Sequence, residues 1–351
     1  YASLLMMGIS TSIIGILPPA ASAGVGVVIV LQLMRLAQCF GRGGTWGGGI
    51  LMAYENVPEN KRSFYAAIPQ IGLPIGFGLS SILIAVPTLL LPEDIFFTWG
   101  WRIPFLAAII LTVIVIRQKG EMMETEDYKK AQAKLEAEEA EGKEHTVGFI
   151  PMVKGYWKTL LLGCGTRWVD GTFYNIFIVW ILSYCSNWLG MPLIQTYIIT
   201  IIACIFKIPF TLFGGWCAQK LGNTRTFVIG ALASAVLSIP TLKVIELSKG
   251  NLAITIIGIV LGWSIAYNLI WAVISSLWSS YFETEVRYSG ISFVYHVPSF
   301  LVAGMVPTIC TLLINYGKGD TIYVGIYSTV VALISAACAL ALKARHDRGE
   351  K

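Results

Sequence analysis

Residues 31–65 read LQLMRLAQCFGRGGTWGGGILMAYENVPENKRSFY. Arg35 lies within an apolar run, glycines crowd the positions that follow, and a short loop ends in the basic pair Lys61-Arg62. In water this run would be a core helix interrupted by glycines. In a bilayer it would be a spanning helix that lets its neighbours approach closely and holds a charge where charge is costly. The first question is therefore which solvent surrounds the chain.

The composition indicates a membrane. Of the 351 residues 56% are hydrophobic and 13% are charged, with a mean hydropathy of +0.70, whereas about a quarter of the residues of soluble domains are charged. Apolar stretches of about 18 residues or more, long enough to cross roughly 30 Å of hydrocarbon, recur along the chain. Without the alternating pattern of a β-barrel, they predict an all-α membrane protein. The ten stretches are 2–20, 23–53, 63–91, 98–116, 159–188, 193–217, 224–245, 252–280, 289–315 and 321–342.

The distribution of basic residues predicts the orientation in the membrane. If residue 1 lies on the cytoplasmic side, 17 of the 25 Lys and Arg residues fall in inside loops and four in or near outside loops. Because cytoplasmic loops carry the excess of positive charge, we expect both termini of this chain to be cytoplasmic.

A long polar interval divides the chain. It predicts an N-terminal half of four helices at 1–116, a cytoplasmic linker at 117–158, and a six-helix half with a short cytoplasmic tail at 159–351. The linker is rich in helix formers between residues 124 and 143. A regulatory partner site in the linker is the alternative interpretation.

The two halves contain the same short motif, an acidic residue, a short loop and a basic residue, which we call the loop device. In the first half Glu55 is followed by a short loop and Arg62, and in the second half Glu283 is followed by a short loop and Arg287. Each basic residue then leads into the next span. When the helices before these loops are aligned, the first half is two helices short.

Several strings resemble a known family. They include Arg35-x-x-Gln38-x-Phe40-Gly41-x-Gly43-Gly44, Trp99-Gly100-Trp101-Arg102-Ile103-Pro104-Phe105 and Arg287-Tyr288-Ser289-Gly290. They resemble the metabolite:proton symporters of the major facilitator superfamily, and within them the branch that contains the bacterial shikimate transporter. The resemblance implies a twelve-helix fold of which ten helices are visible here, so the first two would precede Tyr1. It also implies an inner-membrane transporter.

The superfamily's loop motif has a counterpart in the second half. Gln219 stands where the motif has an acid, and this departure weakens a charge relay at that loop. We expect the loops to control the conformational change. The candidate loop residues are Glu55, Arg62, Gly215, Lys220, Gly222, Arg225, Glu283 and Arg287.

Ionisable residues inside the spans are candidates for the binding site. A charge at the centre of a helix costs about 2.5–3.5 kcal/mol on insertion scales, so such residues face a wet cavity or a partner. By resemblance, the acidic partner of Arg35 would lie on the absent first helix. The candidate residues for binding substrate and proton are Arg35, Arg167, Asp170, Tyr174, Asn175, Lys207, Tyr267, Asn268 and His296.

Each candidate has a structural alternative. Arg167 and Asp170, three residues apart on one helix face, form either a local ion pair or a substrate and proton site. Lys207 faces the cavity or packs near the bend that Pro209 introduces. His296 suits proton coupling because histidine titrates near neutrality, but a lone histidine within a membrane helix is more often a hydrogen-bonded packing residue. Tyr267 and the other polar candidates line the cavity or pack between helices.

The predicted function is proton-coupled symport of a small polar metabolite. The substrate would be an organic carboxylate such as a shikimate-like or dicarboxylate anion, because four cations within the spans (Arg35, Arg42, Arg167 and Lys207) face one acid, Asp170. We expect a monomer in the lipid bilayer that binds its substrate and protons, with no cofactor, metal or nucleic acid. The alternatives are an uncoupled facilitator or exchanger, and a membrane sensor that does not transport. The sequence carries no nucleophile constellation or phosphate loop and does not predict an enzyme.

Overall fold

The computed structural model describes residues 2–19, 24–117 and 149–349. All the secondary structure assigned in these residues is helical, which confirms the all-α prediction for the described part of the chain. Most of the predicted linker, including its stretch of helix formers at 124–143, lies outside these residues.

Contacts between residues divide the chain into two compact units, which are described separately. The smaller unit comprises Tyr1–Gly49 and Leu79–Glu124, and the larger unit comprises Ile50–Gly78 and Thr125–Lys351. The segment Ile50–Gly78 thus belongs to the same unit as the C-terminal helices. The predicted division into halves at the linker stays a prediction.

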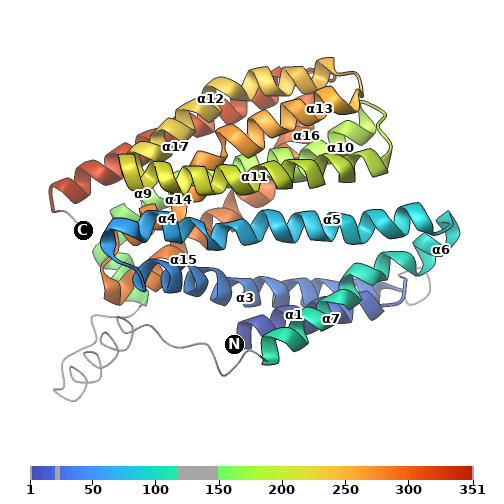
Figure 1. Cartoon of the computed structure of the whole chain (residues 1–351), viewed down its shortest axis with the longest axis horizontal. Coiled ribbons are helices and arrows are strands. Elements are labelled where there is room, and N and C mark those ends of the chain that lie inside the picture. The colour runs from blue at the N-terminus through green and yellow to red at the C-terminus, as the bar shows by residue number, and fades with distance from the viewer. Residues whose placement is uncertain (1, 20–23, 118–148, 350–351) are drawn as a thin grey trace. The chain divides into compact units, whose positions relative to one another are not determined.

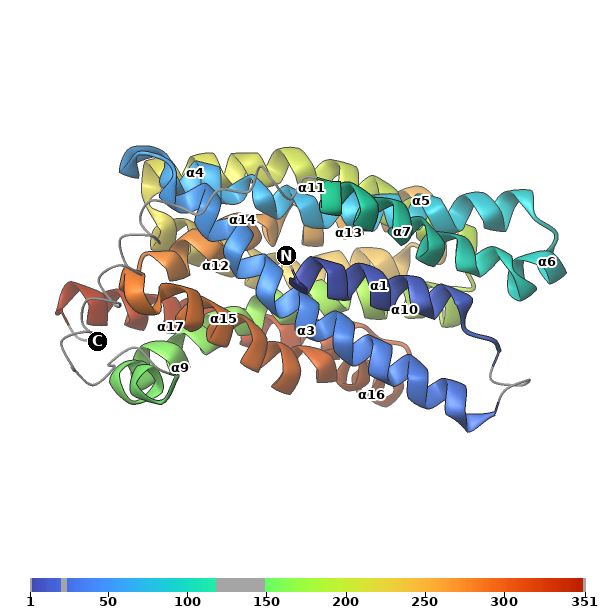
Figure 2. The same ribbon diagram turned by 90° about the horizontal axis from the view of Figure 1, so that it is seen from below.

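The smaller unit is built around two apolar helices, α1 and α7, which lie side by side (Figure 2). Gln38 donates a hydrogen bond of 2.6 Å to the Thr11 hydroxyl, and Arg102 donates one of 3.1 Å to the carbonyl of Leu17. These bonds join segments that are far apart in the sequence. The elements are α1 (Ala2–Ile16), the first part of α3 (Val25–Glu55), the second part of α5 (Gly72–Leu90), α6 (Glu93–Thr98), η3 (Gly100–Arg102) and α7 (Ile103–Arg117).

The larger unit contains the long C-terminal helices. Helix α12 packs against α17, and α9 packs against both α17 and α15 (Figure 1). Its elements are η1 (Glu59–Lys61), α4 (Arg62–Ala67), η2 (Pro69–Ile71), α9 (Phe149–Tyr174), η5 (Asn175–Trp180), α10 (Ile181–Asn187), α11 (Leu193–Leu221), α12 (Asn223–Leu247), α13 (Leu252–Ile259), η6 (Val260–Ala266), α14 (Asn268–Ser279), α15 (Thr284–Leu301), η7 (Ala303–Met305), α16 (Val306–Tyr316) and α17 (Ile322–Asp347), together with the adjoining parts of α3 and α5.

Two adjacent glycines let α11 approach both α4 and α14. A Cβ atom on Gly214 would lie 2.6 Å from the Cβ of Ala272, and one on Gly215 would lie 2.7 Å from the Cβ of Ala67. Because real Cβ atoms do not come this close, the tight packing requires glycine at both positions. Gly215, a predicted loop-motif residue, therefore serves as a packing contact in this structure.

Two helices of the larger unit contain π-helical segments. Segment η5 begins at Asn175, directly after α9, and η6 ends at Ala266, directly before Tyr267. Such segments hold an extra residue in the helical turn and occur frequently at functional sites. Both π-helical segments adjoin residues that the sequence predicts for the substrate and proton site.

Among the described residues six helices are long and apolar enough to cross a membrane. They coincide with the predicted spans to within a few residues at most ends, as for the predicted 224–245 and the observed Asn223–Leu247. Three shorter apolar helices, Ser3–Ile16, Val25–Gly41 and Gly100–Ile114, lie within further predicted spans. The remaining predicted span, 159–188, is occupied by α9, η5 and α10.

Candidate functional site

A buried ion pair on α9 forms the centre of the candidate site. The Arg167 guanidinium pairs with the carboxylate of Asp170 one turn later. Arg167 is 7% exposed and Asp170 is 1% exposed. The guanidinium also donates a hydrogen bond of 3.2 Å to the Ser299 hydroxyl and lies 4.3 Å from the centroid of the Tyr295 ring. The structure thus confirms that these two residues share a helix face, and it adds partners from α15.

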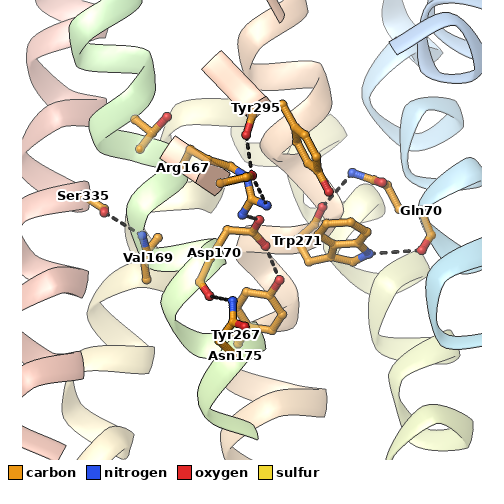
Figure 3. A network of polar contacts seen from close by, with 12 residues as sticks. Gln70, Arg167, Val169, Asp170, Asn175, Tyr267, Trp271, Tyr295 and Ser335 are labelled. Atoms are coloured by element: carbon orange, nitrogen blue, oxygen red, sulfur yellow. Dashed lines mark hydrogen bonds and ion pairs between the residues drawn. The ribbon is translucent and has the colours of Figure 1, made fainter. Parts of the chain in front are cut away.

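Asp170 also accepts a hydrogen bond from another helix. Its other carboxylate oxygen is the acceptor of the Tyr267 hydroxyl (Figure 3). The Tyr267 ring stacks on Phe173, with an interplanar angle of 8° and a centroid distance of 6.1 Å. Two donors, Arg167 in the same helix and Tyr267 from another, therefore fix the position of the Asp170 carboxylate.

The helix that carries the pair is anchored to its neighbours on both sides. The Ser335 hydroxyl of α17 donates to the carbonyl of Gly165 at 2.7 Å and accepts from the amide of Val169 at 3.1 Å. The Trp278 indole of α14 donates to the Thr166 hydroxyl at 2.8 Å. These bonds fix the turn of α9 on which Arg167 lies.

Lys207 of α11 lies in a box of aromatic side chains, which we define as Trp263, Tyr267 and Trp271. Its ammonium nitrogen is 4.3 Å from the Tyr267 ring centroid, 4.4 Å from that of Trp263 and 6.0 Å from that of Trp271. The side chain is fully buried. Within the described part of the chain the ammonium finds no hydrogen-bond acceptor. Cation–π attraction to the rings stabilises it only in part.

Asn268 braces the main chain at Lys207. Its amide donates a hydrogen bond of 2.7 Å to the Lys207 carbonyl and accepts one of 3.1 Å from the Thr211 hydroxyl. Asn268 is buried. It therefore positions α11 beside α14, while the Lys207 side chain points into the aromatic box.

Trp271 joins the aromatic box to the segment after α4. Its indole donates to the carbonyl of Gln70 at 3.1 Å, and the Gln70 amide donates to the carbonyl of Trp271 at 3.2 Å. Figure 3 shows these two bonds beside the ion pair. Trp271, one wall of the aromatic box, is thus held by Gln70, which lies 201 positions earlier in the sequence.

The remaining predicted site residues lie around this cluster or outside it. The Asn175 amide donates to the carbonyl of Gly171 in its own helix, at 2.8 Å. Tyr174 packs against the Phe77 ring at 5.7 Å. The His296 ring contacts that of Tyr295 edge-on at 5.1 Å, so it is one side chain away from Arg167. Arg35 belongs to the smaller unit and its side chain is exposed.

The basic residues of the two loop devices lie against the same aromatic ring. The Arg62 guanidinium lies 5.4 Å and the Arg287 guanidinium 5.8 Å from the centroid of the buried Tyr54 ring. Glu283 is exposed, and the side chain of Glu55 lies outside the described part of the structure. The two copies of the device are therefore joined through Tyr54.

The other loop-motif residues are at the junction of α11 and α12. Lys220 lies 5.6 Å from the Trp216 ring centroid, and Arg225 is exposed. Gly222 joins the two helices with φ 89°, a conformation that favours glycine. This part of the motif forms a tight turn.

Sequence reasoning missed three contributors, Trp263, Tyr295 and Ser299. The signal for Trp263 was present, because Trp263, Tyr267 and Trp271 follow at a spacing of four and so share a helix face. Tyr295 and Ser299 carry no such signal, since their contact with Arg167 depends on how α15 packs against α9. Among the described residues no group of three or more His, Cys, Asp and Glu side chains is placed to hold a metal ion.

Comparisons with known proteins agree with this architecture. The family model described as "Major Facilitator Superfamily" matches residues 2–302. The inner membrane metabolite transport protein YhjE of Escherichia coli is 31% identical, over 99% of this chain and 77% of that protein. The shikimate transporter of the same organism is 29% identical, over 96% of this chain and 76% of that protein.

Solved structures show the same fold. The proton:xylose symporter XylE has a TM-score of 0.74 at 15% identity, covering 97% of this chain and 78% of that one. The fucose:proton symporter FucP of E. coli has a TM-score of 0.64 at 13% identity, covering 97% and 83%. With the family match over most of the chain, the predicted transporter fold is confirmed. The chain belongs to the Major Facilitator Superfamily and is a membrane transporter, not an enzyme.

Proposed function

We propose that this transporter carries a small carboxylate-bearing metabolite together with protons. The observation that carries the proposal is the buried cluster of Arg167, Asp170 and Lys207, in which two cations accompany one acid. Arg167 is neutralised by Asp170, whereas the Lys207 ammonium lies against aromatic rings and, among the described residues, has no hydrogen-bond partner. Such a cluster attracts an anion, because charges interact strongly where water is excluded.

The proton step follows from the partners of Asp170. Its carboxylate accepts from both Arg167 and Tyr267. A proton on Asp170 would cancel the negative charge that pairs with Arg167 and so strengthen the attraction of the cluster for the substrate anion. Loss of that proton on the other side of the membrane would restore the ion pair. Substrate and proton occupancy are thereby linked.

The names of the relatives support both parts of the proposal. Among them are the shikimate transporter and the proline/betaine transporters, whose named compounds each bear a carboxylate. Two structural neighbours are named as proton symporters of sugars. We extend to this chain an inner-membrane location, both termini in the cytoplasm, a monomeric state and alternating access between two helical halves.

Uptake by proteoliposomes tests the proposal. The purified protein is reconstituted, and radiolabelled shikimate, proline and succinate are offered separately with the outside more acidic than the inside. Proton symport predicts accumulation above the external concentration and its collapse on addition of an uncoupler. Accumulation that the uncoupler leaves unchanged contradicts the proposal.

The two alternatives give different results in the same vesicles. An uncoupled facilitator brings the label only to equal concentrations inside and outside, with or without the pH gradient. A membrane sensor shows saturable binding with no label entering the lumen. Either result would replace proton symport as the function.

A further inference from the structure

Two buried donors next to each other lack acceptors. In the described part of the structure neither the Lys207 ammonium nor the indole N–H of Trp263 has a hydrogen-bond partner. Both side chains are fully buried, and the ammonium lies 4.4 Å from the centre of the Trp263 ring. Buried donors are nearly always paired in proteins. A pair of unsatisfied donors at one place therefore indicates a site for an acceptor that comes from outside.

The other buried cation is in a different situation. Arg167 has Asp170, the Ser299 hydroxyl and the Tyr295 ring as partners, and within the described part of the chain its Nε–H has no acceptor. The Lys207 ammonium has three N–H donors, and the residues that the structure describes offer no acceptor to any of them. Of the two cations, Lys207 has the greater capacity to bind an incoming anion.

We propose that Lys207 and Trp263 form the docking point for the substrate's carboxylate, and that Arg167, Asp170 and Tyr267 act on the proton alone. The inference rests on the proposed symport and divides it between two groups of residues. Tyr267 joins them, because its hydroxyl donates to Asp170 while its ring lies 4.3 Å from the Lys207 ammonium. We therefore expect a substitution in either group to affect the other group through the Tyr267 side chain.

The charge of the docking point selects a monocarboxylate. Lys207 is the one cation of the docking point, and a single carboxylate neutralises it. A dicarboxylate would leave an excess negative charge in a buried site, which is costly. The flat faces of the aromatic box suit a ring-shaped or apolar body attached to that carboxylate. A monoanion that moves with one proton transfers no net charge, so transport is electroneutral.

The first experiment measures binding. The purified protein is titrated with shikimate, benzoate, proline and succinate while its tryptophan fluorescence is followed, and shikimate methyl ester serves as the uncharged analogue. We expect at least one monocarboxylate to bind, and succinate and the ester to bind at least about tenfold more weakly. Binding of succinate alone, or of no monocarboxylate in the panel, overturns the inference.

Variants then assign the docking point. Lys207→Met is expected to weaken monocarboxylate binding by about 10- to 100-fold, Lys207→Arg to restore part of it, and Trp263→Phe to weaken it by about three- to tenfold. The matched control is Lys158→Met, since Lys158 also lies against a tryptophan, at 5.4 Å from the Trp157 ring, but is exposed. Wild-type affinity in Lys207→Met overturns the inference.

Thermal unfolding guards against a folding defect. Because Lys207→Met removes an unpaired buried charge, its Tm should equal or exceed that of the wild type. A merely structural lysine would instead lower the Tm on replacement, and a lowered Tm in Lys207→Met, even with weak binding, counts against the docking role.

A last measurement separates this inference from the proposed function. In proteoliposomes the inference expects a pH gradient to drive uptake and a potassium diffusion potential without a pH gradient to drive none. Uptake driven by the potential contradicts electroneutrality while leaving proton symport in place. Uptake without any proton dependence contradicts the proposed function, whereas the binding loss in Lys207→Met would still support the docking point.

Discussion

The indole of Trp271 donates to the carbonyl of Gln70, and the amide of Gln70 donates in return to the carbonyl of Trp271, at 3.1 Å and 3.2 Å. Each side chain thus satisfies the other's main chain. Gln70 is 2% exposed, so both bonds lie away from water. The exchange fixes α14 to the segment after α4 at the wall of the aromatic box.

Trp271→Phe should lower stability and leave the aromatic wall in place. Phenylalanine retains a ring but not the indole N–H, so the loss is about 1 kcal/mol for one hydrogen bond. Thermal unfolding of the purified variant measures it. Trp157→Phe is the control, because Trp157 is 54% exposed. Equal Tm values for the two variants would show that the bond to Gln70 contributes nothing.

Asp170→Asn should lower stability and abolish proton-driven accumulation. The change leaves the buried Arg167 guanidinium without its counter-ion, and removal of one partner of a buried pair costs about 3–5 kcal/mol. The double variant Arg167→Gln, Asp170→Asn should recover much of the stability because no unpaired charge remains, but none of the coupling. Accumulation of substrate by Asp170→Asn against its gradient would refute the proton role.

Gly215→Ala should push α11 away from α4. The new methyl group would lie 2.7 Å from the Cβ of Ala67, and overpacking of this kind costs about 1–3 kcal/mol. Gly155→Ala is the matched control, since a Cβ there meets nothing within 4 Å. Thermal unfolding compares the two variants. A smaller loss for Gly215→Ala than for Gly155→Ala would contradict the packing role.

Tyr54→Leu should weaken the contact that joins the two loop devices, whereas Tyr54→Phe should keep it. A leucine has no π face for the Arg62 and Arg287 guanidinium groups, and each cation–π contact contributes about 0.5–1 kcal/mol. Uptake rates and Tm should fall in Tyr54→Leu and stay closer to wild type in Tyr54→Phe. Equal losses in both variants would assign the effect to the hydroxyl instead.

Asp320 should make stability depend on pH in the acid range. The Lys243 ammonium, 2.7 Å from the Asp320 carboxylate, lowers the pKa of that carboxyl, and the amide of Ile322 lowers it further. A group whose pKa is lowered in the folded state stabilises above its unfolded pKa of about 3.9, and this stability is lost as the pH falls through the folded pKa.

Thermal unfolding between about pH 6 and pH 3 tests this dependence. The wild-type Tm should fall toward acid pH by more than that of Asp320→Asn, because the variant has no carboxyl to protonate there. Asp347→Asn is the control, since Asp347 is exposed at the end of α17. Identical pH profiles of wild type and Asp320→Asn would contradict the assignment.

Hydropathy alone placed the helices, because a bilayer accepts few spanning structures. The predicted span at 193–217 is observed as Leu193–Leu221, and the predicted span at 321–342 as Ile322–Asp347. The Arg167–Asp170 pair was also predictable, since residues three apart share a helix face. These features depend on residues that are close together in the chain, so a single sequence is enough to predict them.

The partners across helices were not predictable from one sequence. Tyr267 and Asp170 are 97 residues apart and Gln70 and Trp271 are 201 apart, so their contact depends on how whole helices pack. The side chain of Arg35, favoured for function from its place in an apolar run, is exposed. Hydropathy identifies a costly charge but not the surface that it faces.

The π-helical segments have a consequence for how the site can move. Segment η5 follows the turn of Asp170 and η6 precedes Tyr267, so each helix stores one surplus residue next to the site. Successive residues of an α-helix are about 100° apart around its axis. If a surplus residue passes along its helix, the side chains it passes swivel by that angle while both helix ends keep their places. We expect spin labels flanking η5 to report this swivel as a change in orientation with little change in separation; a constant orientation through the transport cycle would show that the stored residue stays where it is.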